Sequence, residues 1–407
     1  MNYPVKNIYG KTNNQKISVN VVGSKSITAR AMLISALAEG ESVLFGAQFS
    51  DDCATFLQCL KTLGIEVETD GAALKIKGCG GRLKKDKAEI NVGSAGTAAR
   101  FLPAFLAFQN GRYVINCSQQ MKNRPVQPLT SALSRLGAKI EFFEKEGSFP
   151  FAIEGAASPA TALEVDVSKS SQFLSALLIS AVCAGKPLTV KPYGSHGLDY
   201  VNMTAEMQRA FGAEVKEENG AFTVCGGYRA RNYTIEPDIS AACYFYAANK
   251  ILGTEICVEG VGSRSLQGDT KFIKLLQTFD GGEVNAASFS DQALTLAAIA
   301  PYFGSPTRIT GIGHIRAQEC DRIKAIAYNL AAMGVKCEEF ADGVKIYPSQ
   351  PKPAKIKTFG DHRVAMSFAV TGLRADGIII ENAEVCSKTF KEFFTVLDNL
   401  CARLTAG

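Results

Sequence analysis

Basic side chains stand near the predicted starts of several helices. The octet GSKSITAR (residues 23–30) puts a lysine and an arginine within about one turn of a helix start, and GSAGT (93–97) is followed by an arginine in the same way. The positive end of the helix dipole disfavours cations unless an anion is bound. The pattern therefore predicts a site for phosphate or carboxylate groups. The cations concerned are Lys25, Arg30, Arg100, Arg124, Arg322, Arg363 and Lys388.

Two carboxylates could move protons in such a site. Asp291 precedes a predicted apolar helix, and Glu319 precedes Asp321 and Arg322. Paired carboxylates in different surroundings separate a general acid from a general base. Taken alone, Asp291 is better explained as a helix cap than as a site residue, and Glu319 could be part of an exposed charge cluster.

An internal repeat supplies the elements that must position these groups. Helical patterns end in small turns whose glycines, at 64, 137, 212, 282 and 334, are 73, 75, 70 and 52 residues apart. A hairpin follows each turn except the fourth, where it is nearly absent after Val284. We expect a second helix in each unit to open at sites such as Arg124-Pro125, and a sixth unit to end in a helix over 388–404.

Six units indicate an α/β (α+β) protein with three units in each of two domains. The boundary is predicted near Glu236-Pro237-Asp238, after the third unit is complete. One domain is then 23–237. The other is discontinuous, 1–22 plus 238–407, because the predicted strand at about 16–22 precedes the first helix.

Composition excludes several classes of function. The 407 residues hold 44 Lys+Arg against 39 Asp+Glu without a long basic run, which argues against nucleic-acid binding. No apolar stretch is long enough to span a membrane, and the start is not signal-like, so we expect a cytoplasmic protein and, in addition, a monomer. With three histidines and twelve scattered cysteines, we predict no metal site and reduced thiols.

The motifs resemble those of a known enzyme family. GSKSITAR, GSAGTAAR, MKNRP, SSQFLSALL, LQGD, SDQAL, ECDRI, DHRVAM and SKTF, in this order, are similar to those of the 5-enolpyruvylshikimate-3-phosphate synthases. The resemblance covers essentially the whole chain. It implies two domains of three βαβαββ units with the active site in the interdomain cleft. It also implies transfer of the enolpyruvyl group of phosphoenolpyruvate to shikimate 3-phosphate, in aromatic amino-acid biosynthesis, without a cofactor.

The resemblance also implies residue roles. Asp291, Glu319 and Lys25 would be catalytic. Shikimate 3-phosphate would contact Lys25, Ser26, Arg30, Ser170, Ser171, Gln172, Tyr200, Asp291, His314 and Gln318. Phosphoenolpyruvate would contact Lys25, Gly96, Thr97, Arg124, Gln172, Arg322, Arg363 and Lys388.

Several positions depart from the family pattern. Ser94 replaces a common asparagine, Gln318 replaces the lysine before the predicted catalytic glutamate, and His314 replaces asparagine or arginine. Losing the lysine removes a charge-assisted contact worth about 1.5 to 3 kcal/mol, unless His314 or Arg316 compensates. The spacing of Ser195 and Tyr200 is also wider than in the family.

Three alternatives follow. UDP-N-acetylglucosamine enolpyruvyl transferase shares the chemistry, but Lys25-Ser26 and the spacing of Cys117 from Arg124 speak against it. A non-catalytic homologue would explain Gln318 and His314, although the acid/base pair and the cations are intact. A domain of a larger multi-enzyme polypeptide is the third alternative, although we expect the chain to be complete.

Overall fold

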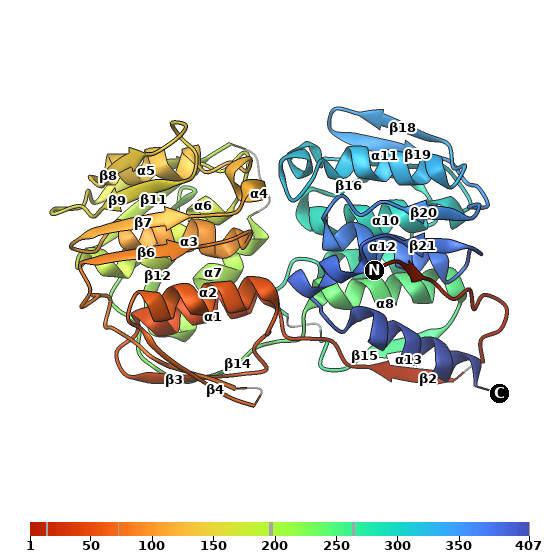
Figure 1. The fold of residues 1–407 in the computed structure, drawn as a ribbon, viewed down its shortest axis with the longest axis horizontal. Helices are drawn as coiled ribbons and strands as arrows, with labels where there is room; N and C mark the ends of the chain where they lie inside the picture. The colour runs from red at the N-terminus through yellow and green to blue at the C-terminus, as the bar shows by residue number, and fades with distance from the viewer. Residues whose placement is uncertain (14, 72, 195–197, 263–264, 407) are drawn as a thin grey trace. The chain divides into compact units, whose positions relative to one another are not determined.

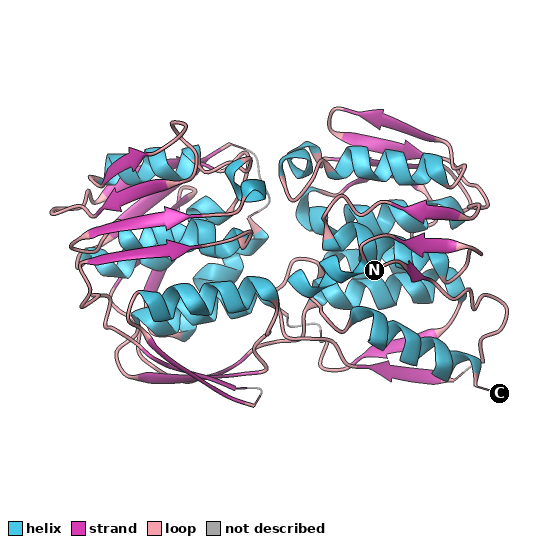
Figure 2. Ribbon diagram, in the orientation of Figure 1, coloured by secondary structure: helices cyan, strands magenta, loops and turns pink. Residues whose placement is uncertain are grey.

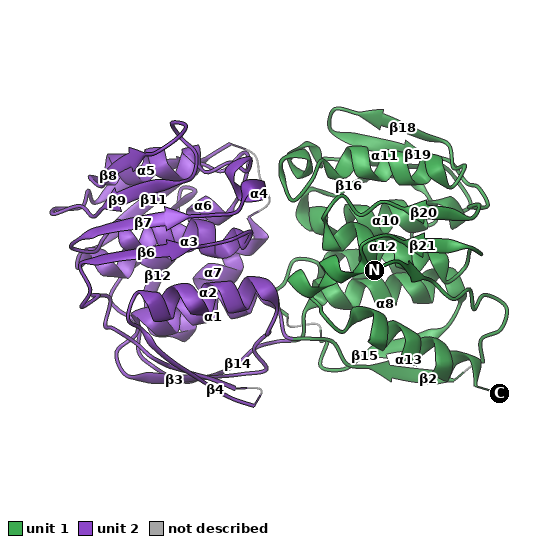
Figure 3. Ribbon diagram, viewed as in Figure 1, with its two compact units in different colours: residues 1–22, 237–407 green, residues 23–236 purple. Residues whose placement is uncertain are grey.

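The chain forms two compact units in the computed structural model, which describes residues 1–13, 15–71, 73–194, 198–262 and 265–406. Unit 2 is Gly23–Glu236, and unit 1 joins Met1–Val22 to Pro237–Gly407 (Figure 3). The division falls one residue before the predicted boundary, so that Pro237 belongs with unit 1. The reason is local, because the Pro237 carbonyl accepts a hydrogen bond from Gln267 Nε2 at 2.8 Å.

Unit 2 contains three four-stranded sheets among its described residues (Figure 1). The strand orders are β14–β3–β5–β4, β6–β7–β9–β8 and β10–β11–β13–β12. The strands are β3 (Glu41–Phe45), β4 (Glu66–Asp70), β5 (Ala73–Lys77), β6 (Lys87–Asn91), β7 (Arg112–Asn116), β8 (Lys139–Phe142), β9 (Phe151–Glu154), β10 (Ala162–Asp166), β11 (Leu188–Tyr193), β12 (Glu214–Glu218), β13 (Ala221–Cys225) and β14 (Asn232–Thr234). The helices are α1 (Lys25–Leu37), α2 (Asp51–Thr62), α3 (Gly96–Leu106), α4 (Gln119–Lys122), α5 (Gln127–Leu136), α6 (Gln172–Ser180), η1 (Ala181–Ala184) and α7 (Asp199–Ala210).

Unit 1 also contains three sheets among its described residues, and two of them have fewer than four strands. Its described strands form the sheets β16–β17–β19–β18, β1–β21–β20 and β15–β2. The strands are β1 (Tyr3–Pro4), β2 (Lys16–Val19), β15 (Glu255–Val258), β16 (Gly282–Asn285), β17 (Thr307–Thr310), β18 (Cys337–Phe340), β19 (Gly343–Ile346), β20 (Ala354–Ile356) and β21 (Ile378–Ile380). The helices are α8 (Ile239–Leu252), α9 (Thr270–Thr278), η2 (Ala287–Gln292), α10 (Ala293–Ile299), η3 (Ala300–Tyr302), η4 (Gly313–Ala317), α11 (Arg322–Ala332), α12 (His362–Gly372), η5 (Ala383–Lys388) and α13 (Phe393–Thr405).

The four predicted hairpins are present, and the fourth turn lacks one as predicted. β4 pairs antiparallel with β5, β8 with β9, β12 with β13, and β18 with β19. β16, in contrast, pairs in parallel with β17 and leads into η2. The predicted N-terminal strand is β2, which pairs in parallel with β15 within unit 1. Because the connection after β16 is short, Asp291 lies in η2, directly before the start of α10.

Each unit has helices that are buried on every side. All residues of α3, α10 and α12 are buried, including the polar residues near the starts of α3 and α12. In unit 2, α1, α3 and α6 contact one another, and in unit 1, α8, α10 and α12 do so. The small sheets lie on the outer sides of each unit (Figure 2). The buried helices carry several of the predicted site residues at their N-terminal ends.

Polar side chains fix where these helices begin. Ser24, Asp238, Asp321 and Asp361 each accept a hydrogen bond from a backbone N–H in the first turn of the helix that follows. Such caps satisfy amide groups that would otherwise lack a partner. The positions of α1, α8, α11 and α12 along the chain are thus set by local sequence.

Two predicted helix starts are wrong. Arg124 and Pro125 lie in the connection between α4 and α5, and α5 begins at Gln127 with Pro128 in its first turn. Lys388 is the last residue of η5, and α13 begins only at Phe393. In both places a short helix precedes the long one, and hydrophobic periodicity does not separate the two.

Candidate active site

Lys25 is the first residue of α1 and pairs with a carboxylate of the same unit. Its Nζ lies 3.2 Å from Asp52 Oδ2, and Asp52 stands in the first turn of α2. The Lys25 side chain is 18% exposed and that of Asp52 is 6% exposed. Asp52 thus holds the ammonium group near the α1 N-terminus, where the helix dipole by itself would disfavour it. Ser26 follows as the second residue of α1.

Arg30 lies in the core of unit 2, with only 1% of its surface exposed. Its guanidinium donates to Thr204 Oγ1 at 2.7 Å, to the Ser26 carbonyl at 2.9 Å and to the Tyr200 carbonyl at 3.2 Å. It also lies 5.4 Å from the centre of the Phe101 ring. Burial lowers the pKa of Arg30 to about 10. The guanidinium therefore joins α1 to α7 and contributes positive potential from beneath the α1 N-terminus.

The predicted serine cluster forms the start of α6. Ser171 is the N-cap residue, and Ser170 Oγ accepts a hydrogen bond from the Gln172 backbone N–H at 3.2 Å. Ser170 and Gln172 are half-buried, whereas Ser171 is buried. Tyr200, near the start of α7, places its ring 5.8 Å from the Arg30 guanidinium. Ser195 lies outside the described residues.

Gly96 and Thr97 begin α3 next to the loop that carries Arg124. A Cβ atom added to Gly96 would lie 3.3 Å from both terminal nitrogens of Arg124. Arg100, one turn later, donates to the Pro125 carbonyl at 2.8 Å and to the Gly96 carbonyl at 3.4 Å. Arg100 therefore supports this loop, and the glycine allows the Arg124 side chain to approach the helix start.

Arg322 is the centre of a charge cluster in unit 1. It is 1% exposed and lies 2.7 Å from Asp361, 3.0 Å from Asp291 and 3.0 Å from Glu319. Burial alone would lower the pKa of Arg322, but the three carboxylates raise it above its usual value. The cluster thus brings both predicted proton-transfer residues onto one guanidinium.

Asp291 bridges two arginines rather than capping a helix. Its Oδ1 accepts from Arg322 and its Oδ2 accepts from Arg363 Nη2 at 2.9 Å. η2 shows no side-chain cap at its start, and neither does α10. Arg363 comes from the first turn of α12, 72 residues away along the chain. The structure thus shows Asp291 in ion pairs and not as a helix cap, the alternative that the sequence offered.

His314 and Gln318 lie beside this cluster. The His314 ring lies with Nε2 2.9 Å from Ser290 Oγ, and burial lowers the pKa of His314, which favours the neutral imidazole. Gln318 Oε1 accepts a hydrogen bond from Arg322 Nη1. Arg316 instead forms ion pairs with Asp321 at 2.8 Å and Glu339 at 2.8 Å, so its charge is already paired with these two carboxylates.

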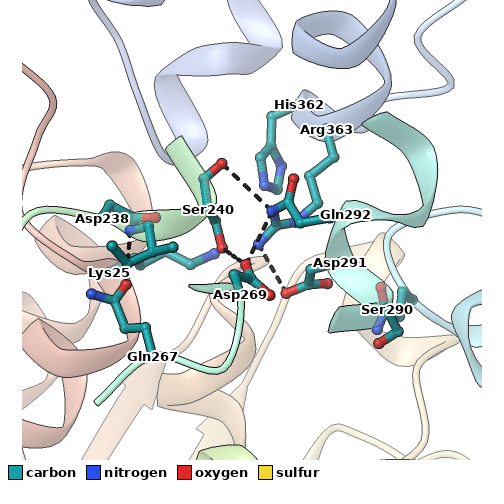
Figure 4. A network of polar contacts seen from close by, with 12 residues as sticks. Lys25, Asp238, Ser240, Gln267, Asp269, Ser290, Asp291, Gln292, His362 and Arg363 are labelled. Carbon is teal, nitrogen blue, oxygen red and sulfur yellow. Dashed lines mark hydrogen bonds and ion pairs between the residues drawn. The ribbon is translucent and has the colours of Figure 1, made fainter. Parts of the chain in front are cut away.

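Lys388 is the last residue of η5 in unit 1, and it is 9% exposed. Three buried carboxylates without a predicted role lie next to predicted site residues: two contact such a residue directly, and one contacts Gln292, which follows Asp291 in the chain. They are Asp52, Asp269 and Asp361. Their positions before or within the first turn of a helix resemble ordinary capping, so only their tertiary contacts distinguish them. Asp269 contacts the site through Gln292 (Figure 4).

Neither a metal cluster nor a membrane span is found among the described residues. No group of three or more His, Cys, Asp or Glu side chains in that part of the chain could hold a metal ion. No described helix is both long enough and apolar enough to cross a membrane. The described cysteines carry free thiols, and every one of them is buried or half-buried.

Comparison with known proteins identifies the family. The model of EPSP synthase (3-phosphoshikimate 1-carboxyvinyltransferase) matches residues 10–286 and 276–397. The chain belongs to this family. A 3-phosphoshikimate 1-carboxyvinyltransferase from Trichormus variabilis is 39% identical over 403 residues, covering 93% of this chain and 95% of the relative. The protein named 3-phosphoshikimate 1-carboxyvinyltransferase 2 from Halalkalibacterium halodurans is 36% identical, covering 95% and 93%.

Solved structures show the fold of the family. EPSP synthase from Acinetobacter baumannii superposes with a TM-score of 0.81 at 24% identity, covering 98% of each chain. The enolpyruvyl transferase NikO from Streptomyces tendae gives 0.75 at 16% identity, covering 98% of this chain and 96% of the other. The enolpyruvyl transferase fold predicted from the sequence is confirmed. Membership of the EPSP synthases also confirms the predicted class of enzyme, a transferase of aromatic amino-acid biosynthesis.

Proposed function

We propose that this chain transfers the enolpyruvyl group of phosphoenolpyruvate to the 5-hydroxyl of shikimate 3-phosphate and releases phosphate. The single observation that carries the residue assignment is the cluster around Arg322. It holds Asp291 and Glu319 at 3.0 Å each and includes Arg363 through Asp291. Two carboxylates next to two arginines combine proton transfer with binding of an anionic substrate.

The reaction needs two proton transfers in the addition step and one in the elimination step. The 5-hydroxyl loses a proton as its oxygen attacks C2 of phosphoenolpyruvate, and the methylene carbon gains a proton, which gives a tetrahedral ketal. Loss of a proton from the new methyl group then expels phosphate. We assign these transfers to Asp291 and Glu319, with Lys25 stabilising the charge on the departing phosphate.

Arg322 and Arg363 would stabilise the negative charge of phosphoenolpyruvate. A substrate anion competes with the carboxylates for these guanidinium groups. Binding would therefore weaken the hold of Arg322 on Asp291 and Glu319 and make it easier for them to take up a proton. This exchange of partners explains why the two proton-transfer carboxylates pair with the arginines that would bind the substrate.

The remaining assignments follow the predicted sets. For shikimate 3-phosphate we propose Lys25, Ser26, Arg30, Ser170, Ser171, Gln172, Tyr200, Asp291, His314 and Gln318. For phosphoenolpyruvate we propose Lys25, Gly96, Thr97, Arg124, Gln172, Arg322, Arg363 and Lys388. The buried position of Arg30 supports a role through its positive potential, with Ser170 and Gln172 closer to the protein surface.

Phosphate release tests the proposal. Phosphoenolpyruvate is supplied with shikimate 3-phosphate or with UDP-N-acetylglucosamine, and the parent is compared with Asp291→Asn and Glu319→Gln. Asp280→Asn, which changes an exposed carboxylate of unit 1, is the matched control. We expect release only with shikimate 3-phosphate, a loss of at least about 100-fold in both site variants, and no loss in the control. Release with the nucleotide sugar, or site variants as active as the parent, would contradict the proposal.

The quaternary state and location proposed here are a monomer in the cytoplasm. The location rests on the sequence composition, in which no apolar stretch is long enough to span a membrane. Light scattering on the purified protein tests the monomeric state, and a mass of twice 43.5 kDa would refute it.

A further inference from the structure

A buried polar network lies directly behind Asp291 in unit 1. Asp269 is 5% exposed and accepts hydrogen bonds from Ser240 Oγ and, at 3.0 Å, from Gln292 Nε2 (Figure 4). Gln292 is fully buried and follows Asp291 in the chain. The carboxylate of Asp269 therefore bonds the side chain of the residue next to Asp291, the proposed proton-transfer group.

The Gln292 amide is held on both sides. Its Nε2 donates to Asp269 and, at 3.5 Å, to the Ser240 carbonyl, while its Oε1 accepts from Thr295 Oγ1 at 3.1 Å. Thr295 in turn lies 3.1 Å from Ser367 Oγ. The network thus ties α8, the residue before α9, α10 and α12 together. Because Gln292 cannot rotate without breaking these bonds, the backbone that carries Asp291 is fixed.

Charge connects the same groups. The pKa of Asp269 is raised to about 6, because burial and, after it, the negative charge of Asp291 raise it more than Arg363, Ser240 and Gln292 lower it. Cys243 of α8 also faces this residue, with its thiol 3.8 Å from the Asp269 carbonyl. Electrostatic coupling is mutual, so an ionised Asp269 favours the protonated form of Asp291 to the same extent.

We infer that Asp269 is a positioning residue for proton transfer by Asp291, which it orients through Gln292 and makes more basic through its own charge. This inference rests on the proposed function of Asp291. It gives the Gln-Gly-Asp segment at 267–269 a role in the reaction beyond starting α9. The carboxylate acts without touching either substrate.

The pH profile of turnover separates this role from a structural one. Asp269→Asn removes the charge and keeps the shape, and Asp280→Asn is the matched control on the surface. We expect the limb of the kcat/KM profile that depends on Asp291 to move by about one pH unit to lower pH in Asp269→Asn, because a like charge has gone. Asp269→Glu should restore the position of the limb while kcat remains reduced.

Folding is monitored by thermal unfolding of each variant. If Asp269→Asn does not fold, the smaller and neutral Asp269→Ser must show the same shift. A folded neutral variant with both limbs unmoved, measured beside an active parent, overturns the inference and leaves the proposed function intact. A parent that releases no phosphate with shikimate 3-phosphate overturns the proposed function, and the inference with it.

Discussion

Replacing Arg322 by methionine tests whether one buried guanidinium holds the charge cluster together. Methionine keeps an unbranched apolar side chain in place of the arginine stem but removes the charge. The change leaves Asp361, which is fully buried, without its ion pair at 2.7 Å, and it removes one partner each from Asp291 and Glu319. The variant should therefore fold less stably and bind phosphoenolpyruvate poorly.

The expected loss of unfolding free energy is about 3 to 5 kcal/mol, the usual cost of removing one partner from a buried ion pair. Three separate losses do not add, because Asp291 keeps Arg363 at 2.9 Å and Asp361 keeps the backbone N–H of Arg363 at 2.8 Å. Arg316→Met is the matched control. Its partners Asp321 and Glu339 lie at the surface, so we expect a loss of at most about 1 kcal/mol.

Chemical unfolding of both variants and the parent, repeated between pH 5 and pH 8, provides the measurement. Buried carboxylates that lose their cation favour the neutral form, so the folded variant binds more protons than the unfolded chain. The deficit should therefore be greatest at pH 8 and shrink as the pH falls. A deficit below about 1 kcal/mol, or one equal at both ends of this range, would refute the reasoning.

Three further predictions concern single positions. Gly96→Ala should raise the KM for phosphoenolpyruvate several-fold without changing stability, because the new Cβ would lie 3.3 Å from the Arg124 guanidinium; an unchanged KM in steady-state kinetics would contradict the placement. Gln318→Lys should lower the KM for shikimate 3-phosphate by about tenfold, in line with one charge-assisted contact, and an equal or higher KM would remove Gln318 from the acceptor site. The pKa of Asp269 is raised to about 6, so the folded protein binds a proton more tightly than the unfolded chain and loses stability as the pH rises from about 4 to about 6. Unfolding midpoints of the parent should fall across this range, and those of Asp269→Asn should lack this part of the fall.

Much of the fold follows from sequence signals that act over a few residues. The caps Ser24, Asp238 and Asp361 start helices because each side chain bonds an amide two or three residues further on. The turn at Gly137 needs a positive φ, here 111°, which glycine adopts without strain. Hairpins and repeat spacing have the same local origin, so the units of the repeat and the anionic character of the ligands could be predicted without coordinates.

Local signals do not determine which side chains meet. Arg322 and Arg363 come together on Asp291 from 31 and 72 residues away, and only the packing of α10, α11 and α12 brings them there. The sequence presents Asp269 and Asp361 as helix starts, whereas Asp361 pairs with Arg322 in the charge cluster and Asp269 is buried against Gln292 beside it. The types of chemical group are thus determined by the sequence itself. Their partners, and with them their charge states, are decided by the tertiary structure, because burial strengthens electrostatic contacts that are weak in water.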